Sequence, residues 1–234
     1  MPASSPESAS IVVAVDGPSG SGKSSVCRGV ARRLGLRYLD TGSMYRALTW
    51  WVLERGVDPE DRPEVARLAR ELPLQVRMDP ADPGVSVDGT DVSAAIRETR
   101  ISTAVSAIAT NLAVREELVR RQQAIAAEGG VVIEGRDITT VVAPGAPVRV
   151  LLTASEEARL ARRALEVHGA DDAAALEATR DQVLRRDADD STVAAFHEAA
   201  DGVTVVDSSA MTLEQTIDAV LALVARVTTV GDPR

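Results

Sequence analysis

The chain has 234 residues, of which 45% are hydrophobic and 26% are charged, and its formal net charge is −9. This length fits one large domain, or one domain with insertions, and is enough to bury a substantial core. The balance of 35 acidic to 26 basic side chains argues against a protein that wraps a nucleic-acid backbone. The single cysteine, Cys27, excludes an internal disulfide, and two histidines argue against a histidine-rich metal site.

The chain also lacks the signals of a membrane or secreted protein. No run approaches the about 18 apolar residues that a membrane-spanning helix needs, so we expect no contact with a membrane. Residues 1–10 have neither the basic nor the apolar region of a secretory signal, and their serine and proline content predicts a disordered tail. We therefore expect a cytoplasmic monomer whose partners are small molecules and not nucleic acid.

Short apolar runs alternate with longer helical patterns along the chain. The runs expected to form strands are 11–15, 37–39, 131–133, 148–152 and 203–206. The patterns expected to form helices are 24–34, 43–55, 93–127, 155–167 and 212–227. Continuous apolar runs are typical of strands that are covered on both faces. The alternation predicts an α/β fold with a five-stranded parallel sheet flanked by helices.

Two segments interrupt this alternation. Between about residues 59 and 97, several prolines and alternating valines surround Asp88-Gly89, a dipeptide typical of a two-residue hairpin turn. This pattern predicts a small antiparallel β insert. Residues 159–199 are dense in charge and lack an apolar period, which predicts a solvated helical excursion.

The most specific motif is the glycine-rich run that follows the first expected strand and precedes the first expected helix. Its sequence matches G-x-x-x-x-G-K-[ST], a phosphate-binding loop (P-loop) whose glycines let successive N–H groups turn toward phosphate oxygens. Lys23, the only lysine of the chain, is expected to contact the β- and γ-phosphates, and the Ser24 hydroxyl to bind Mg²⁺. The residues expected to bind ATP are Gly17, Pro18, Ser19, Gly20, Ser21, Gly22, Lys23, Ser24 and Ser25.

Two further segments are candidates for the site that receives the phosphoryl group. Residues 40–46, with the sequence DTGSMYR, supply hydroxyls, a tyrosine and an arginine at a helix start, although a helix cap followed by a core tyrosine gives the same pattern. Residues 134–137, with the sequence EGRD, follow an expected strand at the sheet edge where α/β proteins bind ligands. The chain has no N-K-x-D motif, which argues against a regulatory GTPase.

These segments occur in one order together with Ile96-Arg97, residues 114–116 (VRE), 120–122 (RRQ) and 186–191 (RDADDS), and the set resembles the bacterial cytidylate kinases over about residues 11–225. The resemblance implies a P-loop kinase core at 11–40, 131–158 and 200–228, a CMP-binding part at 41–130, and a helical lid at 159–199. It implies transfer of the γ-phosphoryl group of Mg-ATP to CMP or dCMP. Two positions depart from the family pattern, Glu134 in place of Asp and Val193 in place of Arg.

The resemblance also assigns roles to individual residues. Lys23, Arg136 and Arg186 would be the catalytic cations. The residues that would bind CMP are Thr41, Tyr45, Arg46, Ser106, Arg115, Arg136, Asp137 and Asp190. A carboxylate such as Asp137 is a natural acceptor for the amino group of cytosine, and Arg115 can donate to its acceptor edge.

Two alternatives remain open at this stage. One is a P-loop kinase that acts on a different monophosphate or on a small metabolite. The other is a P-loop regulatory protein that hydrolyses ATP without an acceptor.

Overall fold

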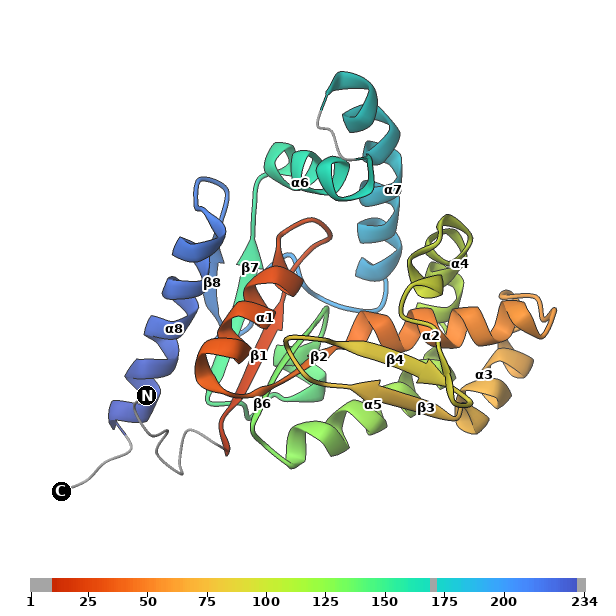
Figure 1. Ribbon diagram of the computed structural model, residues 1–234, viewed down its shortest axis with the longest axis horizontal. Helices are drawn as coiled ribbons and strands as arrows, with labels where there is room; N and C mark the ends of the chain where they lie inside the picture. Colours follow the sequence, from red (N-terminus) through yellow and green to blue (C-terminus); the bar gives the residue numbers. More distant parts are fainter. Residues whose placement is uncertain (1–9, 169–171, 231–234) are drawn as a thin grey trace.

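The computed structural model describes residues 10–168 and 172–230 and is built around a five-stranded parallel sheet (Figure 1). The strands are β1 (Val12–Asp16), β2 (Arg37–Asp40), β6 (Val131–Gly135), β7 (Val148–Thr153) and β8 (Thr204–Asp207). Their spatial order is β2-β6-β1-β7-β8, so β1 is central and pairs with β6 on one side and β7 on the other. The segments that follow β1 and β6 therefore leave the sheet side by side at its carboxyl edge. The predicted parallel sheet is confirmed.

Helices cover both faces of this sheet because successive residues of each strand point to opposite sides. Val13 and Val15 of β1 pack against α1 (Lys23–Leu34) and α8 (Leu213–Val230), whose apolar residues join the same buried cluster. Ala14 of β1 belongs to the cluster on the other face, which is covered by α2 (Thr41–Glu54) and α5 (Leu112–Ala127). β1 is thus held rigidly from both sides at the point where the P-loop begins.

The predicted antiparallel insert is present, but it is preceded by a helix that the sequence analysis missed. This helix, α3 (Arg62–Glu71), begins at Asp61, whose side chain accepts a hydrogen bond of 3.2 Å from the Glu64 N–H. It leads into an antiparallel sheet of β3 (Leu74–Arg77), β4 (Gly84–Val87) and β5 (Thr90–Asp91). Asp88 and Gly89 form the two-residue turn between β4 and β5 with positive φ values of 50° and 76°. The hairpin prediction is confirmed.

The single helix expected at 93–127 was wrong. The segment forms a short 3₁₀ turn, η2 (Ala95–Arg97), and two α-helices, α4 (Thr99–Ala109) and α5. The break falls at Asn111, whose side chain accepts from the Ala113 N–H at 3.2 Å and so caps α5. The Asn111 amide also donates to the Arg62 carbonyl at 2.9 Å, which ties the break to α3.

Two helices stand beyond the carboxyl edge of the sheet, α6 (Glu156–His168) and α7 (Ala173–Ser191), and pack against each other (Figure 1). A short π-helix, η3 (Ile138–Val142), follows β6. Of the tail expected at residues 1–10, only Ser10 lies within the described residues. In the described ranges no helix is both long and apolar enough to cross a membrane.

Candidate active site

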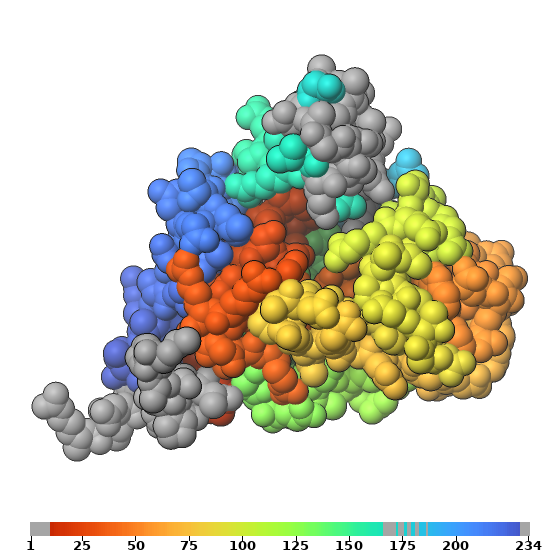
Figure 2. Space-filling view, viewed as in Figure 1, coloured from red at the N-terminus to blue at the C-terminus, as the bar shows by residue number. Residues whose placement is uncertain are grey.

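The carboxyl edge of the sheet borders a cavity of about 550 Å³, which is visible as the hollow between the P-loop and α4 in Figure 2. Its walls come from the P-loop, α2, α4, α5, the turn after β6, α6 and α7 with the turn that follows it. Seven basic side chains line it: Lys23, Arg28, Arg46, Arg97, Arg115, Arg136 and Arg163. Four acidic side chains line it: Asp40, Glu134, Asp137 and Asp190. A chain with a net charge of −9 thus surrounds this cavity with an excess of positive charge, which favours an anionic ligand.

The P-loop has the backbone curl that phosphate binding requires. Gly17 and Gly20 have φ values of 153° and 76°, and a Cβ atom at either would lie within 2.5 Å of a backbone oxygen. Only glycine fits such positions without a shift of the chain. Ser19, Gly20, Gly22, Lys23, Ser24 and Ser25 line the cavity. Of the other predicted ATP-binding residues, Gly17 and Pro18 contribute backbone carbonyl groups to hydrogen bonds, and Ser21 lies on a second cavity.

Lys23 is the charged centre of the loop. Its Nζ donates to the Pro18 carbonyl at 2.8 Å and reaches the Ser21 Oγ at 3.5 Å. Burial, and then the positive charge of Arg136, lower the pKa of Lys23 to about 8. Because the positive charges of Lys23 and Arg136 repel each other, an anion bound between them stabilises both.

On the other side of the cavity, the predicted 40–46 segment turns from β2 into α2. Asp40 caps α2 by accepting from the Ser43 N–H at 3.0 Å, and its carboxylate also pairs with Arg46 at 2.8 Å. Arg46 and Tyr45 both line the cavity, whereas the Thr41 hydroxyl on its wall donates to the Glu134 carbonyl at 2.8 Å. Within the described residues, the buried Nε of Arg46 has no hydrogen-bond partner, which leaves one donor available to an anion.

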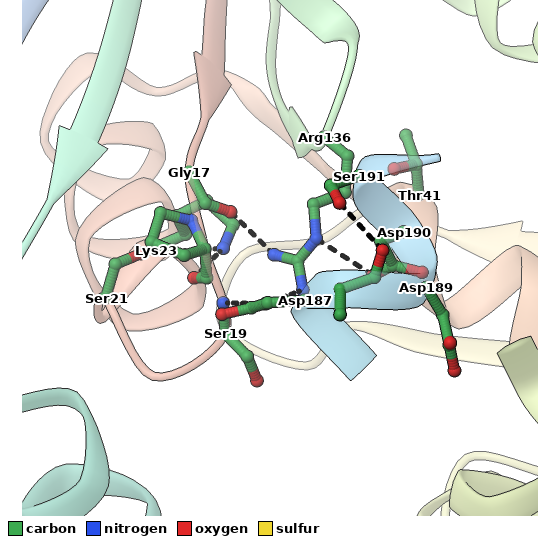
Figure 3. A network of polar contacts seen from close by, with 12 residues as sticks. Gly17, Ser19, Ser21, Lys23, Thr41, Arg136, Asp187, Asp189, Asp190 and Ser191 are labelled. Atoms are coloured by element: carbon green, nitrogen blue, oxygen red, sulfur yellow. Dashed lines mark hydrogen bonds and ion pairs between the residues drawn. The ribbon is translucent and has the colours of Figure 1, made fainter. Parts of the chain in front are cut away.

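Arg136 links the two sides of the site (Figure 3). Its Nη1 donates to the Gly17 carbonyl at 2.6 Å, and its Nη2 and Nε donate to Asp187 and Asp190, each at 3.0 Å. The guanidinium also lies over the Phe196 ring, 4.6 Å from its centroid. This arginine therefore already rests between the P-loop and α7.

The sequence analysis missed Asp187, although Figure 3 shows it in contact with the P-loop. One carboxylate oxygen of Asp187 accepts from the backbone N–H of Ser19 at 2.9 Å and from Arg136 at 3.0 Å. The other oxygen accepts from Arg159 of α6, whose Nη1 also donates to the Ser19 carbonyl at 2.9 Å. Asp187 is 4% exposed, so this carboxylate occupies a buried, cationic position against a P-loop N–H. Its only sequence signal was its place beside Arg186.

Arg115 of α5 and Asp137 form an ion pair at the wall of the cavity. Burial raises the pKa of Asp137, and the neighbouring Arg115 opposes that rise. Ser106, which was expected beside them, lies on α4 and does not line this cavity, whereas its neighbours Val105 and Ala109 do. The described residues thus bring together seven of the eight predicted CMP-binding side chains.

The end of α7 contributes Asp190 and the following turn contributes Val193 to the cavity. The side chain of Arg186, predicted as a catalytic cation, lies outside the described residues. At the position where the family pattern has an arginine, Val193 presents no charge. Arg159, Arg162 and Arg163 of α6 contact or line the site from the same side.

Ser24, Glu134 and Asp40 form the part of the site that fits a hard cation. Burial and the nearby Asp40 carboxylate raise the pKa of Glu134, while Lys23 and hydrogen bonds from Tyr38 and Ser24 lower it. Hydroxyl and carboxylate oxygens are the donors that Mg²⁺ accepts, so the residues present are compatible with a metal ion. In the described ranges no group of three or more His, Cys, Asp or Glu side chains could hold a metal by itself.

A second cavity of about 310 Å³ lies against the other side of the P-loop. It is lined by the loop residues 20–22 and by Arg162, Met211, Leu213 and Thr216. Arg162 donates to the Ser208 carbonyl at 2.6 Å and to its hydroxyl at 2.9 Å, which fixes the guanidinium at the cavity wall.

The glycine-rich loop lies between the central strand and α1, and it borders a cation-lined cavity with room for a second ligand. These two features define a phosphotransferase of the P-loop kinase class. Comparisons with known proteins narrow the class, because the cytidylate kinase family model matches residues 13–226. The chain belongs to the cytidylate kinase family. Members of this family are enzymes that use ATP together with a divalent metal ion.

Three relatives illustrate how completely this chain matches the family. A protein named cytidylate kinase from Cutibacterium acnes is 51% identical over 92% of this chain and 96% of its own length. Proteins of the same name from Streptomyces avermitilis and Nocardia farcinica are 46% and 47% identical. The alignment with the Streptomyces protein covers 92% of this chain and 92% of that protein. The alignment with the Nocardia protein covers 96% of this chain and 98% of that protein.

Proposed function

We propose that this chain transfers the γ-phosphoryl group of ATP to CMP, and to dCMP, giving ADP and the corresponding diphosphate. The observation that carries the proposal is a single cavity shared by the P-loop and the Arg115–Asp137 pair, with Arg136 between them. A triphosphate on the P-loop and a cytosine on Asp137 would bring donor and acceptor phosphates together near Arg136. Membership of the cytidylate kinase family supports ATP as the phosphoryl donor and CMP as the acceptor.

The acceptor requires no general base in this proposal. A phosphate monoester has a second pKa near about 6, so CMP is largely ionised at neutral pH and is already nucleophilic. Catalysis then consists of alignment and of neutralising the charge that spreads over the transferred group. Lys23, Arg136 and Arg46 are the described cations whose positions suit this role, and Arg186 is proposed as a fourth.

We propose Mg²⁺ as the metal ion, with Ser24 as its protein ligand. Glu134 and Asp40 would act through hydrogen bonds to its water ligands, since both carboxylates lie beside Ser24 at the cavity. When bound with ATP, the ion supplies positive charge to the β- and γ-phosphate oxygens. Glu134 carries one methylene more than the Asp of the family pattern, and it is buried and hydrogen-bonded all the same.

Cytosine would be read by Asp137 and Arg115. The amino group of cytosine donates to the carboxylate, and Arg115 donates to the O2 and N3 acceptors. Uracil presents a carbonyl where cytosine has the amino group, so Asp137 would face it with acceptor against acceptor. The pair therefore supplies a physical basis for the preference of CMP over UMP.

Helices α6 and α7 are proposed as a lid that ATP must open before it can bind. The Asp187 carboxylate accepts from the same Ser19 N–H that a phosphate oxygen would use, so the two anions compete for it. The adenine of ATP would lie in the second cavity, where Met211 and Leu213 offer an apolar surface and Arg162 a planar cation.

An acceptor panel tests the proposed function. Purified protein is given ATP and Mg²⁺ alone, and then with CMP, dCMP, UMP, AMP or shikimate, while ADP is measured. We expect ADP to form rapidly with CMP and dCMP and slowly without an acceptor. Equal ADP formation in every arm would favour an ATPase, and rapid formation with another acceptor would favour a different kinase.

A further inference from the structure

Asp16 is a buried carboxylate that no step of the proposed reaction uses. It ends β1, directly before the P-loop, and is 1% exposed. Its register partner on β6 is Gly135, so it stands beside the turn that carries Arg136 and Asp137. A charge buried this deeply is expected to have specific partners.

Those partners all belong to the first turn of η3. One oxygen of Asp16 accepts from the Ile138 N–H at 2.7 Å. The other accepts from the Thr139 N–H at 2.8 Å and from the Thr139 hydroxyl at 2.6 Å. These N–H groups begin a helix and have no partner within it. Asp16, at the end of β1, thus caps η3, which follows the neighbouring strand β6.

The residue that would ordinarily cap this helix is Asp137. It occupies the N-cap position of η3, but its side chain makes no capping hydrogen bond. An aspartate at this position usually accepts from the N–H of the second or third residue of its helix, here Thr139 or Thr140. Here Asp16 occupies one of these groups, the Thr139 N–H, and the Asp137 carboxylate pairs with Arg115 at the cavity instead.

We infer that Asp16 is a positioning residue for base recognition: by capping η3 in place of Asp137, it leaves the Asp137 carboxylate free to read cytosine. The inference rests on the proposed function. Without Asp16, the free N–H group of Thr139 draws the Asp137 side chain back onto its own helix. The enzyme then keeps its P-loop but loses discrimination between bases.

The test is Asp16→Asn, whose amide oxygen accepts from one N–H while its NH₂ group faces the other donors. We expect the ratio of kcat/KM for CMP to that for UMP to fall about tenfold, while the KM for ATP changes less than about twofold. If the Asn variant does not fold, the same CMP-to-UMP ratio is measured for Asp16→Ser, which is also uncharged and keeps one acceptor oxygen. Thr139→Val is the matched control, because it removes only the hydroxyl hydrogen bond and leaves both N–H contacts with Asp16.

A double-variant cycle separates this role from a merely structural one. If Asp16 acts through Asp137, adding Asp16→Asn to Asp137→Asn leaves the CMP-to-UMP ratio of the latter unchanged. An unaltered ratio in the Asp16 variants, or additive effects in the double variant, would overturn the inference. The wild-type protein run in parallel decides the proposed function independently, since it must phosphorylate CMP whatever the variants do.

Discussion

Substitution of Asp187 tests most directly how the ligand-free site competes with the binding of ATP. Its carboxylate accepts from the Ser19 N–H of the P-loop and from the guanidinium groups of Arg136 and Arg159. In the proposed complex a phosphate oxygen of ATP would accept from the same Ser19 N–H, so binding would first displace this carboxylate. The substitution Asp187→Asn keeps the size of the side chain and one acceptor oxygen but removes the charge.

The magnitude follows from the two guanidinium contacts. Arg136 and Arg159 contact different oxygens of Asp187, and asparagine replaces one of these oxygens with an NH₂ group that cannot accept. One contact therefore changes from a charged hydrogen bond of about 1.5–3 kcal/mol to a neutral one of about 0.5–1.5 kcal/mol, and the other contact is lost entirely. The ligand-free arrangement therefore loses about 3 kcal/mol, and ATP no longer has to overcome it. Since 1.4 kcal/mol corresponds to about tenfold in affinity, the Kd for ATP is expected to fall about 100-fold.

Isothermal calorimetry of ATP binding, in the absence of CMP, measures this effect. Asp189→Asn is the matched control, because Asp189 lies on the same helix and its substitution removes the same charge without a described contact to the P-loop. We expect a clear gain of affinity in the Asp187 variant and little change in the control. An unchanged or weaker Kd in the Asp187 variant, or an equal gain in both, would refute the displacement reasoning.

Three further predictions concern the catalytic and base-reading groups. Lys23→Ala should lower kcat about 100-fold or more while the Kd for CMP changes little, and near-normal turnover would contradict the role of the P-loop lysine. Because the pKa of Lys23 is about 8, kcat/KM for ATP should decline as the pH rises through that value, and a flat profile would show that its charge is not needed. Asp137→Asn should lose activity on CMP and narrow a wild-type CMP-to-UMP preference of about 10- to 100-fold, and an unchanged ratio would show that Asp137 only orients Arg115.

The parts of the fold that the sequence predicted well are those fixed by local patterns. Short apolar runs marked all five strands of the parallel sheet. In the central strands β1 and β6 the runs are continuous, because a strand covered on both faces has no polar side to alternate. Asp88-Gly89 marked its hairpin because both residues tolerate a positive φ. Asn111 was a local N-cap signal that the sequence analysis did not use, whereas its contact with the Arg62 carbonyl, 49 positions away, was not visible in the sequence.

In the candidate site, too, residues within local motifs were predicted and residues with distant partners were missed. The P-loop and the 134–137 segment were found because their chemistry lies within a few consecutive residues. Asp187 was missed because the carboxylate and the Ser19 N–H that it contacts are 168 positions apart. Asp16 was missed because a single aspartate at a strand end carries no motif, and its partners Ile138 and Thr139 lie more than 120 positions further along the chain. The Asp16 contacts follow from the pairing of β1 with β6, and the Asp187 contact follows from the position of α7 against the P-loop. The sequence patterns determined neither arrangement.

The central claim is direct transfer of the γ-phosphoryl group to CMP, and the fate of that group tests it. Purified protein is incubated with γ-labelled ATP, Mg²⁺ and CMP, and the products are separated. We predict that the label appears in the β-phosphate of CDP, with one CDP formed for each ADP. Label released as inorganic phosphate at the same rate with and without CMP would contradict the claim.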